Sequence, residues 1–295
     1  MKVTWRLFGG VTAIGSLILC WTGVAVAQSG AASGAAAGAA ANSSLNKNIG
    51  KDKSPTSVEN SLDLIKPADQ QEENAYKAFQ AVSPENMQKK IELGETFLQK
   101  YQVSRYRATI YSALTSAYLV TNQVPKMEDA GQKALELNPK DVQVLAMLGQ
   151  TLPRAMNSST PDPVKRLEKA EEYSKRAIEV IPTLTKPSDQ TDQQFTQAKN
   201  QTLAIAHSGL GLVDFRRGDF AGAITELDQS VKLDPRGDAT NYYVLGVANQ
   251  NAKHYEEAAA AFSKCAEFTG SLQATCKDNA EMAKKLVVPQ SGASK

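Results

Sequence analysis

The chain has 295 residues, of which 42% are apolar and 22% charged, so it can form a sizeable folded core. Its formal net charge is +2, and removal of residues 1–27 would leave equal numbers of basic and acidic residues, which argues against a nucleic-acid-binding protein. Two histidines and three cysteines leave little material for a metal site, so we expect no metal and no cofactor.

The first 27 residues have the features of a signal peptide. Lys2 and Arg6 form a basic start, and a long uncharged apolar run ends in Ala25-Val26-Ala27, the small-x-small pattern at which signal peptidase cleaves. Because about twenty apolar residues can span a bilayer, an inner-membrane anchor formed by residues 7–27 is the alternative. In both cases we expect the body of the protein to be exported to the periplasm or cell envelope.

The next segment, residues 28–70, is predicted to be a flexible tether. Its first part, 28–44, consists almost only of Ala, Gly and Ser, and the remainder is polar, so it contains nothing that could form a core. At the other end of the chain, residues 289–295 are expected to be a disordered tail.

From residue 71 the apolar residues follow a helical period, and similar segments recur along the chain. Four of them end successive units: ALELNP (134–139), AIEVIP (177–182), SVKLDP (230–235) and CAEFTG (265–270). Upstream of the last three lie the Leu-Gly pairs Leu148-Gly149, Leu210-Gly211 and Leu245-Gly246. The pattern resembles the tetratricopeptide repeat family, in an exported bacterial form, whose units of about 34 residues combine such a pair with small residues and a final Pro.

The resemblance implies an all-α fold, a right-handed α-solenoid of helix pairs with a C-terminal capping helix. Four units are assigned to 108–272, namely 108–141, 142–182, 204–237 and 239–272, with a helical insertion at 183–203. Residues 71–107 are interpreted as a degenerate leading helix pair, and 273–288 as the capping helix. Within the insertion, one helix is predicted from about Thr191 to Arg216 and would be about 39 Å long.

In this family the first helices of the units line a groove. The positions that would face it are largely uncharged in this chain: Ser112, Ser116, Leu119, Gln143, Gln150, Ser208, Leu212, Phe215, Tyr243, Val247 and Gln250. Such a groove fits an extended or helical peptide held by apolar and amide contacts. The alternative is that the tether or the leading helices cover part of it.

We therefore predict an exported scaffold for protein–protein interactions that binds a peptide or helical segment of a partner in the cell envelope. A fixed accessory subunit of an envelope assembly or secretion complex is one alternative, and an enzyme is the least favoured. No nucleotide-binding, hydrolase or metalloprotease motif occurs, and neither His207 nor His254 has a suitable partner at useful spacing. No catalytic, cofactor-binding or metal-binding residue is expected.

Cys265 and Cys276 are predicted to form a disulfide. Signal-peptide cleavage would remove Cys20 and leave this pair in an oxidising compartment. Cys265 lies near the end of the last repeat, and Cys276 lies in the first part of the capping helix, which should fold back on it. Two buried free thiols are the alternative.

Overall fold

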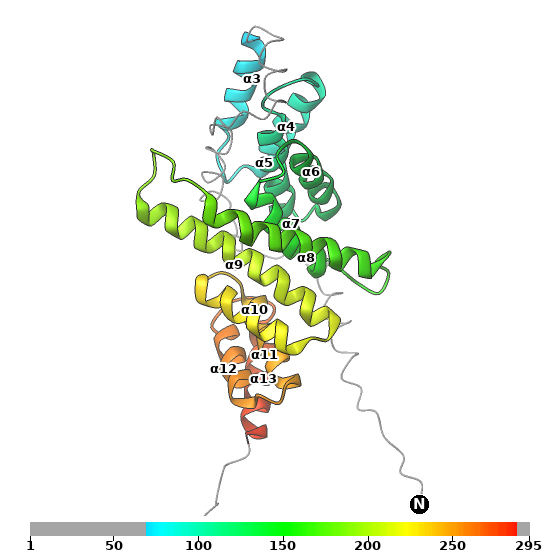
Figure 1. Cartoon of the computed structure of the whole chain (residues 1–295), viewed down its shortest axis with the longest axis vertical. Helices are drawn as coiled ribbons and strands as arrows, with labels where there is room; N and C mark the ends of the chain where they lie inside the picture. Colours follow the sequence, from blue (N-terminus) through cyan, green and yellow to red (C-terminus); the bar gives the residue numbers. More distant parts are fainter. Residues whose placement is uncertain (1–68, 288–295) are drawn as a thin grey trace, which may run out of the picture.

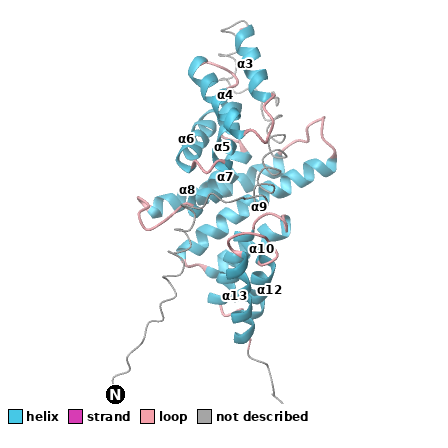
Figure 2. Cartoon of the chain, turned by 180° about the vertical axis from the view of Figure 1, so that it is seen from behind, coloured by secondary structure: helices cyan, strands magenta, loops and turns pink. Residues whose placement is uncertain are grey.

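The computed structural model describes residues 69–287, and all regular secondary structure within them is helical (Figure 1, Figure 2). The helices are, in chain order, α3 (Gln70–Gln80), α4 (Met87–Lys100), α5 (Arg107–Val120), α6 (Val124–Leu137), α7 (Val142–Arg154), α8 (Pro163–Val180), the 3-10 helix η3 (Ile181–Thr183), α9 (Asp192–Arg217), α10 (Phe220–Leu233), α11 (Ala239–Asn251), α12 (Tyr255–Cys265) and α13 (Gln273–Leu286). The predicted signal peptide, the predicted tail and all but the last two residues of the predicted tether lie outside the described residues.

The helices stack as an α-solenoid, as predicted. Each odd-numbered helix from α3 to α11 packs against the helix that follows it, and the resulting pairs succeed one another along the long axis of the molecule (Figure 1). The first helices α5, α7, α9 and α11 also contact one another in this order, and α13 packs on α12. The first helices therefore form one continuous side of the solenoid, which we call the first-helix face.

Local sequence signals set the ends of these helices. The Asp141 side chain accepts a hydrogen bond from the backbone N–H of Val144 and begins α7, and Thr191 and Gln194 form a reciprocal capping box at the start of α9. Gly218 ends α9 with a φ of +81°, a conformation in which glycine has no side-chain penalty. The chain can then reverse directly into α10.

Helix α9 is by far the longest element. It has 26 residues, whereas α7 has 13 and α10 has 14, and at 1.5 Å per residue it is about 39 Å long. Together with α8 it crosses the long axis of the molecule and projects beyond the neighbouring helices (Figure 1). Despite its length, neither α9 nor any other helix within residues 69–287 is apolar enough to be a candidate membrane span.

Three helices meet at a single close contact, formed by Gly149 on α7, Ser174 on α8 and Gly209 on α9, which we call the glycine crossing. A Cβ atom added to Gly209 would lie 2.8 Å from the backbone carbonyl carbon of Gly149 and would overlap the Ser174 Oγ. A Cβ atom at Gly149 would overlap the same oxygen. Only residues without a side chain allow α7 and α9 to approach so closely.

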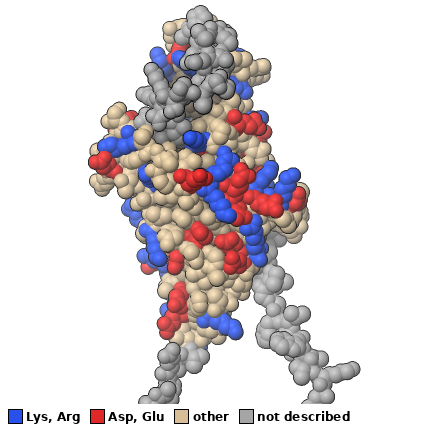
Figure 3. All heavy atoms as spheres, viewed as in Figure 1, with Lys and Arg blue, Asp and Glu red and all other residues tan. Residues whose placement is uncertain are grey.

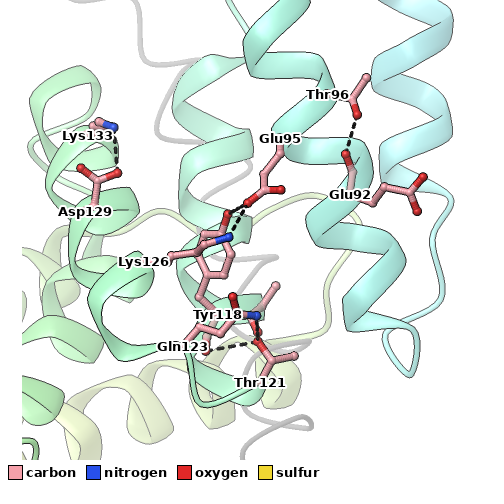
Figure 4. Close-up of polar contacts among 10 residues, drawn as sticks. Glu92, Glu95, Thr96, Tyr118, Thr121, Gln123, Lys126, Asp129 and Lys133 are labelled. Carbon is pink, nitrogen blue, oxygen red and sulfur yellow. Dashed lines mark hydrogen bonds and ion pairs between the residues drawn. The ribbon is translucent and has the colours of Figure 1, made fainter.

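Polar contacts join helices α4, α5 and α6 in the N-terminal half (Figure 4). The Tyr118 hydroxyl donates a 2.6 Å hydrogen bond to Glu95 Oε1, and Lys126 Nζ lies 3.0 Å from the same oxygen. These two contacts, Tyr118 first and Lys126 second, lower the pKa of Glu95. Each of the three residues comes from a different helix, so the cluster fixes the leading pair against the next one.

The C-terminal helix α13 is held by a disulfide between Cys265 and Cys276. The two Sγ atoms are 1.95 Å apart and the Cα atoms 5.8 Å apart, and both residues are fully buried. Tyr242 packs against this pair and against Phe268. The disulfide therefore fastens α13, the last described helix, to α12.

We expect Gly209→Ala to lower the free energy of unfolding by about 2 to 3 kcal/mol, because the added methyl group has no space and forces α7 and α9 apart. Gly149→Ala should act in the same direction. Urea denaturation monitored by circular dichroism measures both. Gly222→Ala is the matched control, because its methyl group would meet only the side-chain ends of Asp219 and Asp214, and its effect should stay within about 1 kcal/mol. Equal effects at Gly209 and Gly222 would contradict the role of the crossing.

Reduction of the Cys265–Cys276 disulfide should lower the stability of the protein by about 3 kcal/mol, because the loop that it closes is then free in the unfolded chain. Denaturation with and without a dithiol measures the loss, and the Cys265→Ala/Cys276→Ala variant should be insensitive to the dithiol. Two thiols that can be alkylated in the native, non-reduced protein would show that the bond is absent.

Candidate functional site

The first-helix face contains the residues that the sequence predicted to contact a partner. Most of them are partly exposed. On α5 these are Ser112, Ser116 and Leu119; on α7, Gln150; on α9, Phe215; and on α11, Tyr243, Val247 and Gln250. All eight are uncharged, so the accessible parts of this face offer hydroxyl, amide, aliphatic and aromatic contacts.

Three of the predicted residues are not accessible. Gln143, Ser208 and Leu212 are only 4%, 0% and 5% exposed, so a partner could not contact their side chains in this conformation. They lie on α7 and α9, which the glycine crossing draws together. The middle of the first-helix face is therefore largely closed, with only Gln150 partly exposed among the predicted residues there. The other accessible residues divide into an N-terminal patch (Ser112, Ser116, Leu119) and a C-terminal patch (Phe215, Tyr243, Val247, Gln250).

Aromatic contacts support the C-terminal patch. Phe215 packs edge-on against Phe220 with ring centroids 5.9 Å apart, and Tyr243 lies at the same centroid distance from Phe262. Tyr243 and Val247 also pack against the apolar cluster of α12 and α13. In the N-terminal patch, the Ser116 Oγ accepts a 3.4 Å hydrogen bond from Gln143. Both patches are thus fixed by contacts with the core beneath them.

A hydrogen-bonded network fills the closed middle of the face. We call it the central polar cluster; its side chains are Gln150, Arg154, Ser208, Ser230, Asp238 and Asn241. Ser208 Oγ accepts from Gln150 Nε2 at 2.9 Å and donates to Asn241 Oδ1 at 2.7 Å. Asn241 Nδ2 in turn donates to Ser230 Oγ at 3.1 Å. The cluster connects α7, α9, α10 and α11.

The central polar cluster includes an ion pair between Arg154 and Asp238. The side chains are 27% and 29% exposed, and a second nitrogen of Arg154 donates to Asn241 Oδ1 at 2.8 Å. Burial opposes ionisation of Asp238, but Arg154 and the backbone N–H of Thr240 outweigh it and lower the pKa of this carboxyl group. The pair joins the end of α7 to the start of α11 across α9.

The remaining polar groups show no catalytic arrangement within residues 69–287. His207 Nδ1 lies 2.7 Å from Glu226 and joins α9 to α10. No group of three or more His, Cys, Asp or Glu in this described part of the chain is placed to hold a metal ion. In Figure 3, basic and acidic side chains alternate across the middle of the molecule, so this side carries no large patch of one sign among the residues that the structure describes.

We expect Asp238→Asn to lower the free energy of unfolding at pH 7 by about 1 to 2 kcal/mol, because it removes the ion pair but keeps the helix cap. The folded-state pKa of Asp238 lies below the ordinary value of about 3.9, so its stabilisation is present above about pH 5 and is lost as pH falls through about 4 and below. Urea denaturation at pH 7 and pH 3 should therefore show a smaller pH effect in the variant.

The control for this experiment is Asp228→Asn, which removes an exposed pairing of 4.0 Å with Lys232 on α10. Its effect at pH 7 should stay within about 0.5 kcal/mol. If wild type and Asp238→Asn lose the same free energy between pH 7 and pH 3, the ion pair has no stabilising role.

Comparisons with known proteins agree with this architecture. Residues 239–270, which include α11 and α12, match the family model described as tetratricopeptide repeat. No curated protein is similar to the chain in sequence.

Three solved structures resemble the chain. A thermophilic tetratricopeptide repeat protein of Thermus thermophilus, TTC0263, is 17% identical, with 72% of this chain and 99% of that chain covered and a TM-score of 0.46. PilW, described as a widely conserved type IV pilus biogenesis factor, is 15% identical over 74% of this chain and 91% of its own, with a TM-score of 0.48. The pilF protein of Pseudomonas aeruginosa is 16% identical over 74% and 90%, also with a TM-score of 0.48. Residues 239–270 thus contain a tetratricopeptide repeat, and the stacked helix pairs of the described residues form an α-solenoid of the kind that such repeats build.

Proposed function

We propose that this protein is an exported interaction scaffold that binds a peptide or helical segment of a partner protein in the cell envelope. The observation that carries the proposal is the pair of uncharged, partly exposed patches on the first-helix face, both of which are fixed by the core beneath them. A surface of this kind excludes water from apolar contacts and still provides hydroxyl and amide groups that orient a ligand.

Export is supported by two independent features. Residues 1–27 have the charge pattern and the small-residue end of a signal peptide. The buried disulfide between Cys265 and Cys276 suits an oxidising compartment, since such bonds are rare where thiols are kept reduced. Both features favour the periplasm or another part of the envelope.

The closed middle of the face determines how a partner would bind. The central polar cluster separates the N-terminal from the C-terminal patch, so no continuous groove is available to a long helix on the described part of this face. A partner segment would place apolar side chains against Phe215 and the ring of Tyr243, and polar groups near the hydroxyls of Ser112 and Ser116. We therefore expect either two contacts made by one partner or the use of one patch alone.

Crosslinking in the native envelope, followed by mass spectrometry, tests the proposal. The variant Ser112→Glu/Gln250→Glu places one charge in each patch without removing a buried side chain. It should reduce recovery of the crosslinked partner about tenfold, which corresponds to a loss of about 1.4 kcal/mol in binding. Helical circular dichroism should be unchanged.

The control is Thr225→Glu, which introduces the same charge at an exposed position of α10, away from both patches. Partner recovery should equal that of the wild type. If the patch variant also retains its partner, binding occurs elsewhere on the molecule. If the protein separates from the envelope only as part of a stable complex, it is a fixed subunit and not an exchangeable scaffold.

A further inference from the structure

The projecting start of α9 creates a hollow that the first-helix face does not include. Helix α10 ends at Leu233, and the following loop turns away, whereas α9 continues in the opposite direction for about three further turns. The Ser230 hydroxyl, which donates to the Ala204 carbonyl at 2.8 Å, marks one of the last contacts between the two helices. Beyond it an open, shallow hollow of about 520 Å³ lies between the two walls, which we call the α9 notch.

Polar uncharged side chains dominate the helical wall of the α9 notch. They are Gln193, Thr196, Gln197, Asn200 and Gln201. Their spacing of three and four residues places them on one face of α9. Asp192 lies at the start of this wall, and Leu233, Asp234, Pro235 and Arg236 form the opposite wall. Four primary amides thus line one short stretch of helix.

Amide side chains match the hydrogen-bonding groups of a peptide main chain. Each Gln or Asn offers two N–H donors and one carbonyl acceptor, the same groups that an extended backbone presents along its edges. The main chain of an α-helical ligand could use them only at its ends, because the other backbone N–H and C=O groups are already bonded within the helix. The wall therefore favours an extended ligand.

One of these amides, that of Gln201, has a buried oxygen, Oε1, that accepts no hydrogen bond in the part of the chain that the structure describes. A buried acceptor without a donor is unfavourable, because it has lost its hydrogen bonds to water and gained none in return. Gln201 lines the notch, so a backbone N–H of a bound ligand could donate a hydrogen bond to this oxygen.

We propose that the α9 notch binds an extended, largely uncharged peptide segment of a partner through the main chain of that segment. From Gln193 to Gln201 the helix rises about 12 Å, which corresponds to three or four residues of extended peptide. Both carboxylates at the rim already have partners within the protein. Asp192 pairs with Lys186 at 2.5 Å, and Asp234 accepts a hydrogen bond from the backbone N–H of Arg236 at 3.3 Å. This site is independent of the first-helix face.

A phage-displayed library of random peptides, each about a dozen residues long, is a suitable probe for the mature full-length protein. Peptides enriched on the wild type should lose at least about tenfold in affinity on the variant Gln197→Ala/Asn200→Ala. The matched control Gln229→Ala removes an amide from α10 outside the notch and should change affinity less than about twofold. Fluorescence anisotropy with synthetic copies of the peptides measures these affinities.

A second measurement separates main-chain from side-chain recognition. Methylation of single backbone nitrogens in the central residues of a selected peptide should weaken binding about tenfold at the contacted positions. Replacement of the side chains there by Ala should have little effect. Stronger loss from the side-chain replacements would overturn main-chain recognition.

The Ser112→Glu/Gln250→Glu variant distinguishes this proposal from the proposed function. Peptides that occupy the notch should bind this variant as tightly as the wild type. If every selected peptide loses affinity there and retains it on Gln197→Ala/Asn200→Ala, the notch proposal is wrong and the first-helix face is the binding site. If selection enriches no peptide at all, the notch is not a peptide site.

Discussion

The close approach of α7 and α9 at the glycine crossing is the constraint on which the rest of the structure depends. Gly149 and Gly209 bring the two backbones together over Ser174, and the first-helix face closes at this point. Ser208, one position before Gly209, is consequently buried and becomes the centre of a polar network. Packing at one pair of glycines thus determines which surface remains accessible to a partner.

The central polar cluster gives this solenoid an unusual connectivity. In repeat proteins each unit ordinarily contacts only its neighbours, so stability is the sum of local terms. Here Arg154 on α7 contacts Asn241 on α11 and Asp238 just before it, with α9 lying between the two helices. The two halves of the chain are therefore linked directly as well as through α9, which favours unfolding of the middle as a single unit.

The sequence was sufficient to predict the helical architecture, because the patterns that indicate it lie within one or two neighbouring helices. Leu-Gly pairs and unit-ending segments recur along the chain, although the longer unit 142–182 and the insertion 183–203 interrupt their period. The apolar face that includes Phe195, Ala198 and Thr202 indicates a long helix through the insertion. The pairing of Cys265 with Cys276 followed from their positions near a single reversal of the chain. These properties depend on spacing along one or two helices.

The limits of that reasoning lie in the distances between helices. Position counting placed Gln143, Ser208 and Leu212 on the first-helix face, but it could not show that the face closes there. The sequence contains one indication of this closure. Gly209 is an additional glycine, two residues before Gly211, which occupies the usual repeat position. The pairing of Arg154 with Asp238 depends on the stacking of three successive units, which spacing within one unit does not define.

The length of α9 has a mechanical consequence. The part of α9 from Asp192 to Gly209 is about 26 Å long and lies on one side of the glycine crossing. A rotation of the helix about this contact would therefore move its first residues through a long arc. A change of about 10° in the crossing angle would displace the far end by about 4 Å. A change in the crossing angle would therefore move the residues of the notch much further than those beside the glycine crossing.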